Sequence, residues 1–145
     1  MKKLLILLLI SANLTAFSQL RKIPASVTES FKDKYPSASN VEWKDKLSVF
    51  IAAFEFDGIQ YEARFNSKGQ WQETESVISE SDLPAPVKDG FEKSKYADWE
   101  PVNFYYLQLP EDKTQYRIVV GKSDLQKKNL VFSSAGRLIK DKITL

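Results

Sequence analysis

The sequence predicts an α+β protein made of two tandem repeats, each with one N-terminal helix packed on a sheet of about four antiparallel strands. Two observations support this fold class. Segments with an apolar residue at every fourth position are followed by segments in which apolar and polar residues alternate, as expected for an amphipathic helix and half-buried strands. This order of segments then occurs a second time.

The repeat is visible when the two halves are compared directly. IPASVTESF at residues 23–31 recurs as LPAPVKDGF at residues 83–91, and RFNSKGQW at residues 64–71 recurs as VFSSAGRL at residues 131–138. The offset grows from 60 to 67 positions, so the second copy has extra residues in its middle. We therefore predict repeats at 19–80 and 81–145 that together form one compact unit.

A leader at residues 1–18 precedes the first repeat. Lys2 and Lys3 are followed by the apolar run at residues 4–10 and by small residues up to Ser18, which is the pattern of a cleaved signal peptide. A membrane anchor would need about 20 apolar residues, and polar residues interrupt this run too early. We expect an exported protein, periplasmic or secreted, with no stable membrane insertion after cleavage. Without any cysteine, it cannot be a lipoprotein.

Composition argues against several functions. Once Lys2 and Lys3 leave with the leader, the chain carries 19 basic and 19 acidic residues, and this balance disfavours a nucleic-acid partner. The chain has no histidine and no cysteine. It therefore lacks the usual zinc ligands, a thiol nucleophile and the histidine of a Ser-His triad. We expect no enzyme activity, no metal and no cofactor.

The first repeat opens with a helix. Its apolar stripe consists of Ile23, Val27, Phe31 and Tyr35. Pro24 suits the first turn and Pro36 ends the helix. A second helix repeats the stripe with Leu83, Val87 and Phe91, and Ser81 or Asp82 is available as its N-cap.

The strongest strand signal of the first repeat is a hairpin around Asp57-Gly58, a pair that favours a type I′ turn. This turn would pair Phe54 with Tyr61 and place the apolar residues of both strands on one face. The opposite face is expected to be wholly or partly solvated. It carries Ile51, Ala53, Glu55, Gln60, Glu62 and Arg64.

The remaining strands follow the same alternation. The first repeat adds VEWK at residues 41–44 and, after a tight turn at residues 66–69, a strand that begins at Trp71. The strands of the second repeat are VNFYYLQL, TQYRIVVG, NLVFSS and RLIKDKI, with a longer KSDLQKK loop in place of Asp-Gly.

These residues carry a resemblance to a known family. The pattern xPxxVxxxFxxxYP, then VxW, then YEAxFxxxGxWxETE resembles the PepSY-like domains, which are also likened to the beta-lactamase inhibitor protein fold. The matching positions are Pro24, Val27, Phe31, Tyr35, Pro36, Val41, Trp43, Tyr61, Glu62, Ala63, Phe65, Gly69, Trp71 and Thr74. The second copy departs from the pattern at Ala97, where the first has Pro36. The resemblance implies an exported binding or inhibitory module with a protein or peptide partner, and it implies no catalytic residue.

Three glutamates, Glu62, Glu73 and Glu75, could in principle form a paired-carboxylate or calcium site. We predict instead that they are solvated strand residues, because the second repeat has Lys140 and Lys142 where the first has Glu73 and Glu75. Likewise, Trp43 and Trp71 lie at core positions of the alternation rather than in a binding site.

The strand containing FYYLQL has two apolar faces, with Tyr105, Leu107 and Leu109 on one of them. Such a strand is either covered twice, by packing between the repeats, or exposed as a binding surface. Our candidate partner-binding surface consists of Glu55, Gln60, Glu62, Arg64, Tyr105, Leu107 and Leu109.

The leading hypothesis is an exported, non-enzymatic binding module that inhibits or modulates another exported protein, such as a peptidase. The alternative is a small-ligand-binding or envelope-stress protein that uses the groove between the repeats. An enzyme acting through carboxylates ranks third.

Overall fold

The computed structural model describes residues 22–143, so the predicted signal peptide lies outside the described residues. The elements, in chain order, are α1 (Ala25–Lys34), β1 (Ser39–Lys46), β2 (Val49–Phe56), β3 (Ile59–Asn66), β4 (Trp71–Ile78), the short 3-10 helix η1 (Glu80–Asp82), α2 (Ala85–Glu92), β5 (Glu100–Gln108), β6 (Thr114–Ser123), β7 (Gln126–Ser133) and β8 (Leu138–Ile143). No helix among these is long and apolar enough to cross a membrane.

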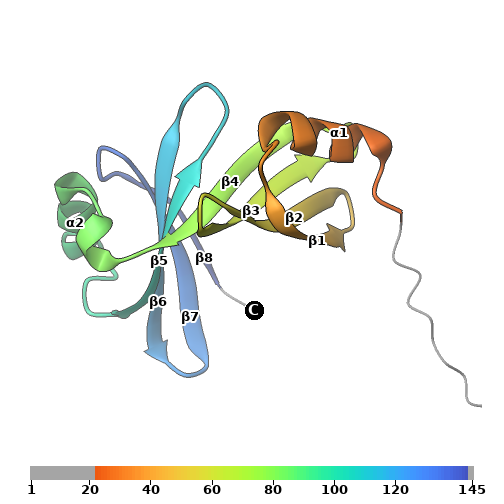
Figure 1. The fold of residues 1–145 in the computed structure, drawn as a ribbon. Helices are drawn as coiled ribbons and strands as arrows, with labels where there is room; N and C mark the ends of the chain where they lie inside the picture. Colours follow the sequence, from red (N-terminus) through yellow and green to blue (C-terminus); the bar gives the residue numbers. More distant parts are fainter. Residues whose placement is uncertain (1–21, 144–145) are drawn as a thin grey trace, which may run out of the picture.

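All eight strands form one antiparallel sheet in which each strand pairs with its neighbours in the sequence (Figure 1). The α+β class is therefore confirmed, but the expectation of a separate sheet for each half is wrong. Strand β4 pairs with β5, from Thr74 opposite Gln108 to Ile78 opposite Phe104. The physical reason is that an unpaired strand edge exposes N–H and C=O groups, and β5 supplies partners for those of β4.

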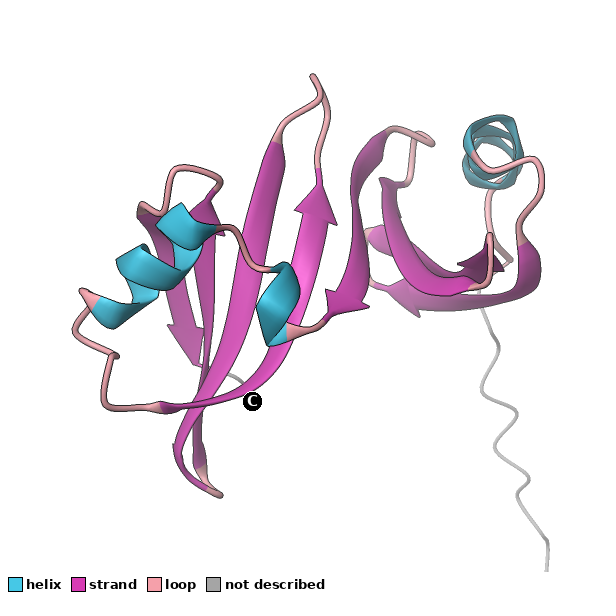
Figure 2. Ribbon diagram, turned by 60° about the vertical axis from the view of Figure 1, so that its left-hand side comes forward, coloured by secondary structure: helices cyan, strands magenta, loops and turns pink. Residues whose placement is uncertain are grey.

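Both helices cover the same face of this sheet. Residues Thr74 and Ile78 point to one side of β4 because their spacing along the strand is even. The Tyr35 hydroxyl at the end of α1 lies 2.6 Å from Thr74 Oγ1, whereas Ile78 packs in the cluster that contains Val87 of α2. The other face carries no helix, and we call it the helix-free face. Figure 2 shows that the sheet is strongly twisted.

The first core lies between α1 and strands β1 to β4. Its buried members are Val27, Phe31, Phe50, Ala52, Phe54, Ala63 and Phe65, with Trp43 and Trp71 packed against them as predicted. The hairpin register is also as predicted, with Phe54 opposite Tyr61. Asp57 and Gly58 both have positive φ, at 50° and 76°, as a type I′ turn requires.

The second core lies between α2 and strands β5 to β8 and shares no residue with the first. Its buried members are Leu83, Val87, Tyr96, Ile118, Val120, Leu130 and Phe132. The predicted N-cap of α2 is wrong, because Pro84 holds that position. Asp82 instead accepts a hydrogen bond of 2.9 Å from the Ser79 N–H and thereby caps η1.

In both halves, a glycine turn packs against the first turn of the helix. Gly69 has φ +80° and Gly136 has φ +83°, a region that disfavours side chains. A Cβ atom at Gly69 would meet the Ser26 carbonyl, and one at Gly136 would meet the Pro86 carbonyl. Glycine at these two turns therefore allows the sheet and the helix backbone to approach closely.

A tyrosine after each helix bonds to the last strand of its half. Tyr35 contacts Thr74, and burial raises the pKa of the Tyr35 hydroxyl. Tyr96 donates a hydrogen bond to the Asp141 carboxylate, and this bond lowers the pKa of Asp141. Lys95 adds an ion pair to Asp141 at 3.2 Å.

Candidate functional site

The candidate site is the middle of the helix-free face, where β3, β4, β5 and β6 lie side by side. Side chains alternate along each strand, so the residues between the core positions point to this face. Its charged residues are Glu62 and Arg64 of β3, Glu73 and Glu75 of β4 and Arg117 of β6, and Lys44 of β1 adjoins them.

These six residues form a continuous chain of ion pairs, which we call the charge network. Arg64 is at its centre: it donates a hydrogen bond to Glu73, and its Nη2 atom lies 4.0 Å from Glu62 and 3.8 Å from Glu75. Arg117 Nη2 donates to Glu75 Oε1 at 2.9 Å. Because three bases, including Lys44, face three acids, the network is neutral as a whole.

The middle of the network is shielded from solvent. The Glu75 side chain is 9 % exposed and that of Arg117 is 18 % exposed. Glu75 Oε2 and Arg117 Nε are buried and make no hydrogen bond within the described part of the chain. The Arg117 guanidinium also lies over the Tyr105 ring, 4.1 Å from its centroid, in a cation–π contact.

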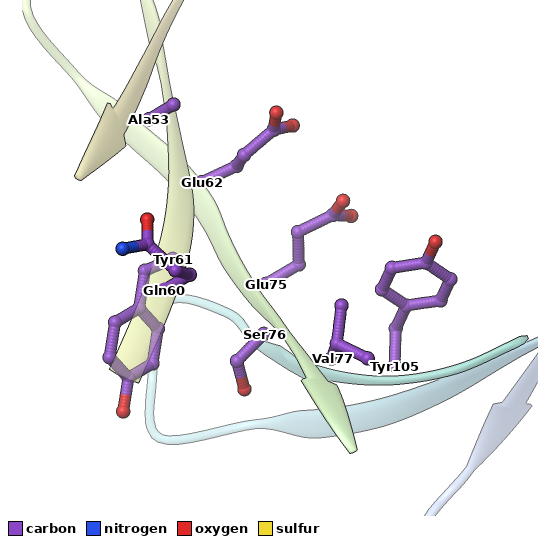
Figure 3. A pocket seen from close by; sticks show the side chains of 8 residues that line it. All are labelled: Ala53, Gln60, Tyr61, Glu62, Glu75, Ser76, Val77 and Tyr105. Carbon is purple, nitrogen blue, oxygen red and sulfur yellow. The ribbon is translucent and has the colours of Figure 1, made fainter. Parts of the chain in front are cut away.

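A hollow of about 390 Å³ opens on one side of Glu75. The residues around it are Ala53, Gln60, Tyr61, Glu62, Glu75, Ser76, Val77 and Tyr105. Figure 3 shows the side chains of Glu62 and Glu75 extending to the same side, with Val77 next to the ring of Tyr105. Val77 is 66 % exposed, so the rim of the hollow is apolar and accessible.

A second hollow of about 240 Å³ lies towards β8. It is lined by Arg64, Glu73, Leu107, Arg117, Asn129, Val131, Lys140, Lys142 and Ile143. Four of these residues are basic and one is acidic, whereas the first hollow has two acids and no base. The helix-free face is therefore acidic at one end and basic at the other.

The structure brings four of the seven predicted site residues together. Glu62 and Arg64 belong to the charge network, Tyr105 lies under Arg117, and Leu107 lines the second hollow. The other three lie further from the network. Gln60 lines the first hollow and donates a hydrogen bond of 3.3 Å to Glu55 beside the β2–β3 turn. Leu109 follows the end of β5 and lines neither hollow.

The expectation of a solvated face needs correction. Glu75 and Ile51 are buried, each 7 % exposed, and Leu107 is 4 % exposed, so none of them offers much surface to a partner. These residues are buried because the aliphatic parts of the arginine side chains and the neighbouring strands cover the centre of the face. Glu73 is partly buried and paired with Arg64, so it is not a simple solvated acid either.

The sequence interpretation missed Arg117 and the role of Glu75. Arg117 is a lone charged residue in the apolar stretch YRIVV of β6, and this isolation is the one signal that could have indicated a buried partner. That partner is 42 positions away in the chain, and no local pattern connects the two.

The chemistry that the face supports is recognition. Its central carboxylates are engaged by arginines, whereas Tyr105 and Val77 offer apolar contact area. In the described ranges, no group of three or more His, Cys, Asp or Glu residues is placed to hold a metal ion.

Known proteins match the chain in sequence and in fold. The family model described as "Putative beta-lactamase-inhibitor-like, PepSY-like" matches residues 49–140. A DUF2874 family protein from Bacteroides ovatus is 29 % identical with a TM-score of 0.72, the match covering 83 % of this chain and 86 % of that one. A BLIP-like protein from Bacteroides fragilis is 27 % identical with a TM-score of 0.69 and the same coverage.

A further structure, described as a "putative periplasmic" protein from Bacteroides eggerthii, shares the fold. It is 24 % identical with a TM-score of 0.71, and the match covers 83 % of this chain and 88 % of that one. No curated protein matches the chain.

Proposed function

The chain belongs to the PepSY-like, beta-lactamase-inhibitor-like family, and from this premise we propose that it is a non-enzymatic module that binds another protein through its helix-free face. One observation carries the proposal. Both helices cover the same side of an eight-stranded sheet, which leaves the opposite side open along with its charge network and two hollows. Aromatic residues and arginine are enriched in protein–protein interfaces, and this open surface carries Tyr105, Arg64 and Arg117.

The partner is an exported protein, and the module acts on it as an inhibitor or modulator. Two relatives support this part of the proposal: the Bacteroides fragilis protein is described as BLIP-like, and the Bacteroides eggerthii protein as periplasmic. A peptidase is one suitable class of target. Periplasmic export also agrees with the signal peptide that the sequence predicts at residues 1–18.

The two halves, 19–80 and 81–145, are proposed to be tandem copies of one unit that share the sheet. Matching positions make matching contacts. The turn glycines Gly69 and Gly136 pack on the same helix position, and the tyrosines Tyr35 and Tyr96 bond to strand positions that correspond under the offset of 67. The partner would then meet a surface composed of both copies.

Site-specific photo-crosslinking tests the proposal. A benzophenone amino acid is placed at Val77, on the rim of the first hollow, and in a control protein at Asp33, an exposed residue of α1. With a periplasmic extract, we expect a saturable protein adduct from position 77 only. Unlabelled wild-type protein should compete for it, whereas a variant with Val77→Arg and Tyr105→Ala should not. Equal adducts from both positions, or none from position 77, would refute the proposal.

A small apolar ligand is the second candidate, and one observation favours it. A groove of about 600 Å³ lies between α1 and β1 and is lined mainly by Phe31, Tyr35, Pro36, Val41 and Trp43. This groove lies within the first half, whereas the alternative predicted from the sequence places the ligand between the repeats. Titration with a long-chain fatty acid should quench the fluorescence of Trp43 if the groove binds ligand, and Trp43→Phe should remove the response.

A further inference from the structure

Two lysines on the helix-free face stand outside the charge network. Lys140 pairs in register with Val131 and Lys142 with Asn129, and these partners alternate with the core residue Leu130 of β7. Both lysines therefore point to the helix-free face, where they line the second hollow with Arg64 and Arg117. In residues 22–143 neither lysine forms an ion pair.

The charge balance of this hollow is therefore positive. The arginines at its edge are already neutralised by Glu73 and Glu75, but the two lysine charges are not. An ammonium group without an internal partner on a binding face gains most from a carboxylate or another anion of the bound molecule.

The floor of the same hollow is apolar. Leu107 is 4 % exposed and Val131 is half-buried, and both lie on the same side of the sheet as the two lysines. A volume of about 240 Å³ has room for only one or two side chains. The lining therefore suits a short segment with carboxylates next to apolar groups.

A dense polyanion suits the hollow less well. Only two unpaired lysines stand at the hollow, and repeated sulfates or phosphates would offer no apolar group to Leu107 and Val131 on its floor. A polypeptide can instead place isolated carboxylates at the lysines and apolar side chains on the floor. The observations thus favour a peptide segment over a sulfated glycan or a membrane surface.

We propose that the β7–β8 end of the helix-free face is the subsite for an acidic, partly apolar segment of the protein partner, whose carboxylates pair with Lys140 and Lys142. This subsite rests on the proposed function and adds the chemistry of the partner. In the first half, Glu73 and Glu75 occupy the corresponding strand positions. The first hollow carries Glu62 and Glu75 and the second carries Lys140 and Lys142, and this difference gives a bound segment one preferred direction.

A charge-reversal experiment tests the subsite. The probe is a fluorescein-labelled peptide of alternating glutamate and leucine, followed by fluorescence anisotropy. We expect saturable binding to the wild-type protein and about tenfold weaker binding to the Lys140→Glu/Lys142→Glu variant. The control variant, Lys22→Glu/Lys68→Glu, changes the net charge equally on exposed residues near α1 and should stay within about twofold of wild type. Circular dichroism and urea unfolding check that both variants fold.

The other possible results would overturn either the subsite or the proposed function. A glutamine–leucine peptide that binds as well as the acidic one, or equal losses in the two variants, would overturn the subsite. The subsite would also be overturned if the acidic peptide does not bind, while heparin or phosphatidylglycerol vesicles bind the wild-type protein and bind the Lys140→Glu/Lys142→Glu variant more weakly. If a partner is cross-linked from Val77 but the peptide does not bind, the subsite is wrong and the proposed function stands. If the peptide binds as expected but no protein is cross-linked, the proposed function fails on its own test.

Discussion

Replacing Arg117 with methionine should destabilise the protein through the Glu75 carboxylate that it leaves behind. Methionine keeps an unbranched apolar stem over Tyr105 but removes the charge. Glu75, with its side chain 9 % exposed, would then have only Arg64 nearby, at 3.8 Å. Removing one partner of a fully buried ion pair costs about 3–5 kcal/mol. Because Glu75 keeps some contact with solvent and still has Arg64 nearby, we expect a cost of about 2–3 kcal/mol here. The midpoint of thermal unfolding should fall by about 10 °C.

A double-mutant cycle with Glu75→Leu isolates the pair. Because Arg117→Met/Glu75→Leu leaves neither charge unpaired, we expect the double variant to lose only about 1 kcal/mol, less than the sum of the single losses. The coupling free energy should be about 1–3 kcal/mol. Urea unfolding followed by tryptophan fluorescence measures all four proteins, since the tryptophans pack on the other face of the sheet.

The exposed end of the network provides the control. The Lys44 side chain is 53 % exposed, so Lys44→Met should cost less than about 0.5 kcal/mol. A coupling free energy below about 0.5 kcal/mol for Arg117 and Glu75 would mean that their pair behaves like that surface pair. The description of a shielded network centre would then be wrong.

Three further predictions follow from the fold. Gly69→Ala and Gly58→Ala impose similar backbone strain, because φ is +80° and +76°, but only the alanine at position 69 would meet the α1 backbone. Gly69→Ala should therefore lower the free energy of unfolding by about 1–3 kcal/mol more than Gly58→Ala, as measured by urea unfolding. Equal losses would contradict the packing of this turn on α1. The lowered pKa of Asp141 stabilises the folded state above about pH 4, and this stabilisation is lost as the pH falls below that value. Asp141→Asn should abolish it, so the midpoints of thermal unfolding of wild type and variant should become equal in acid. Tyr35→Phe should remove the opposite dependence, since the raised pKa of Tyr35 favours the folded state up to about pH 10 and this stabilisation disappears above it; unchanged alkaline unfolding would count against the buried hydroxyl.

The parts of the fold that local chemistry determines could be predicted from the sequence. Asp57-Gly58 defines the turn, the turn defines the register, and the register places Phe54 and Phe65 in the core, all within a few residues of one another. The union of both halves in one sheet could not be predicted in this way. It depends on the pairing of β4 with β5 across the whole of α2, which no alternation within either strand specifies.

In the candidate site, too, only the features that depend on local pattern could be predicted. Alternation correctly placed Glu62 and Arg64 on the face without a helix. The burial of Glu75 escaped prediction because it depends on the twist of the whole sheet and on an arginine of a distant strand. Its sequence neighbours, Thr74 and Ser76, are themselves polar, so nothing nearby marked it as different from an exposed acid.

The order of the strands has a consequence for how the chain acquires its structure. Since every strand pairs only with its neighbours in sequence, each new hairpin can add to an edge that already exists, and no strand has to wait for a later one to be inserted between it and its partner. The N-terminal core contains no residue of the second half, so it can close while the rest of the chain is still emerging. Such a chain can fold from its N-terminus onward, and the docking of β5 on β4 is the step that commits the second half to the first.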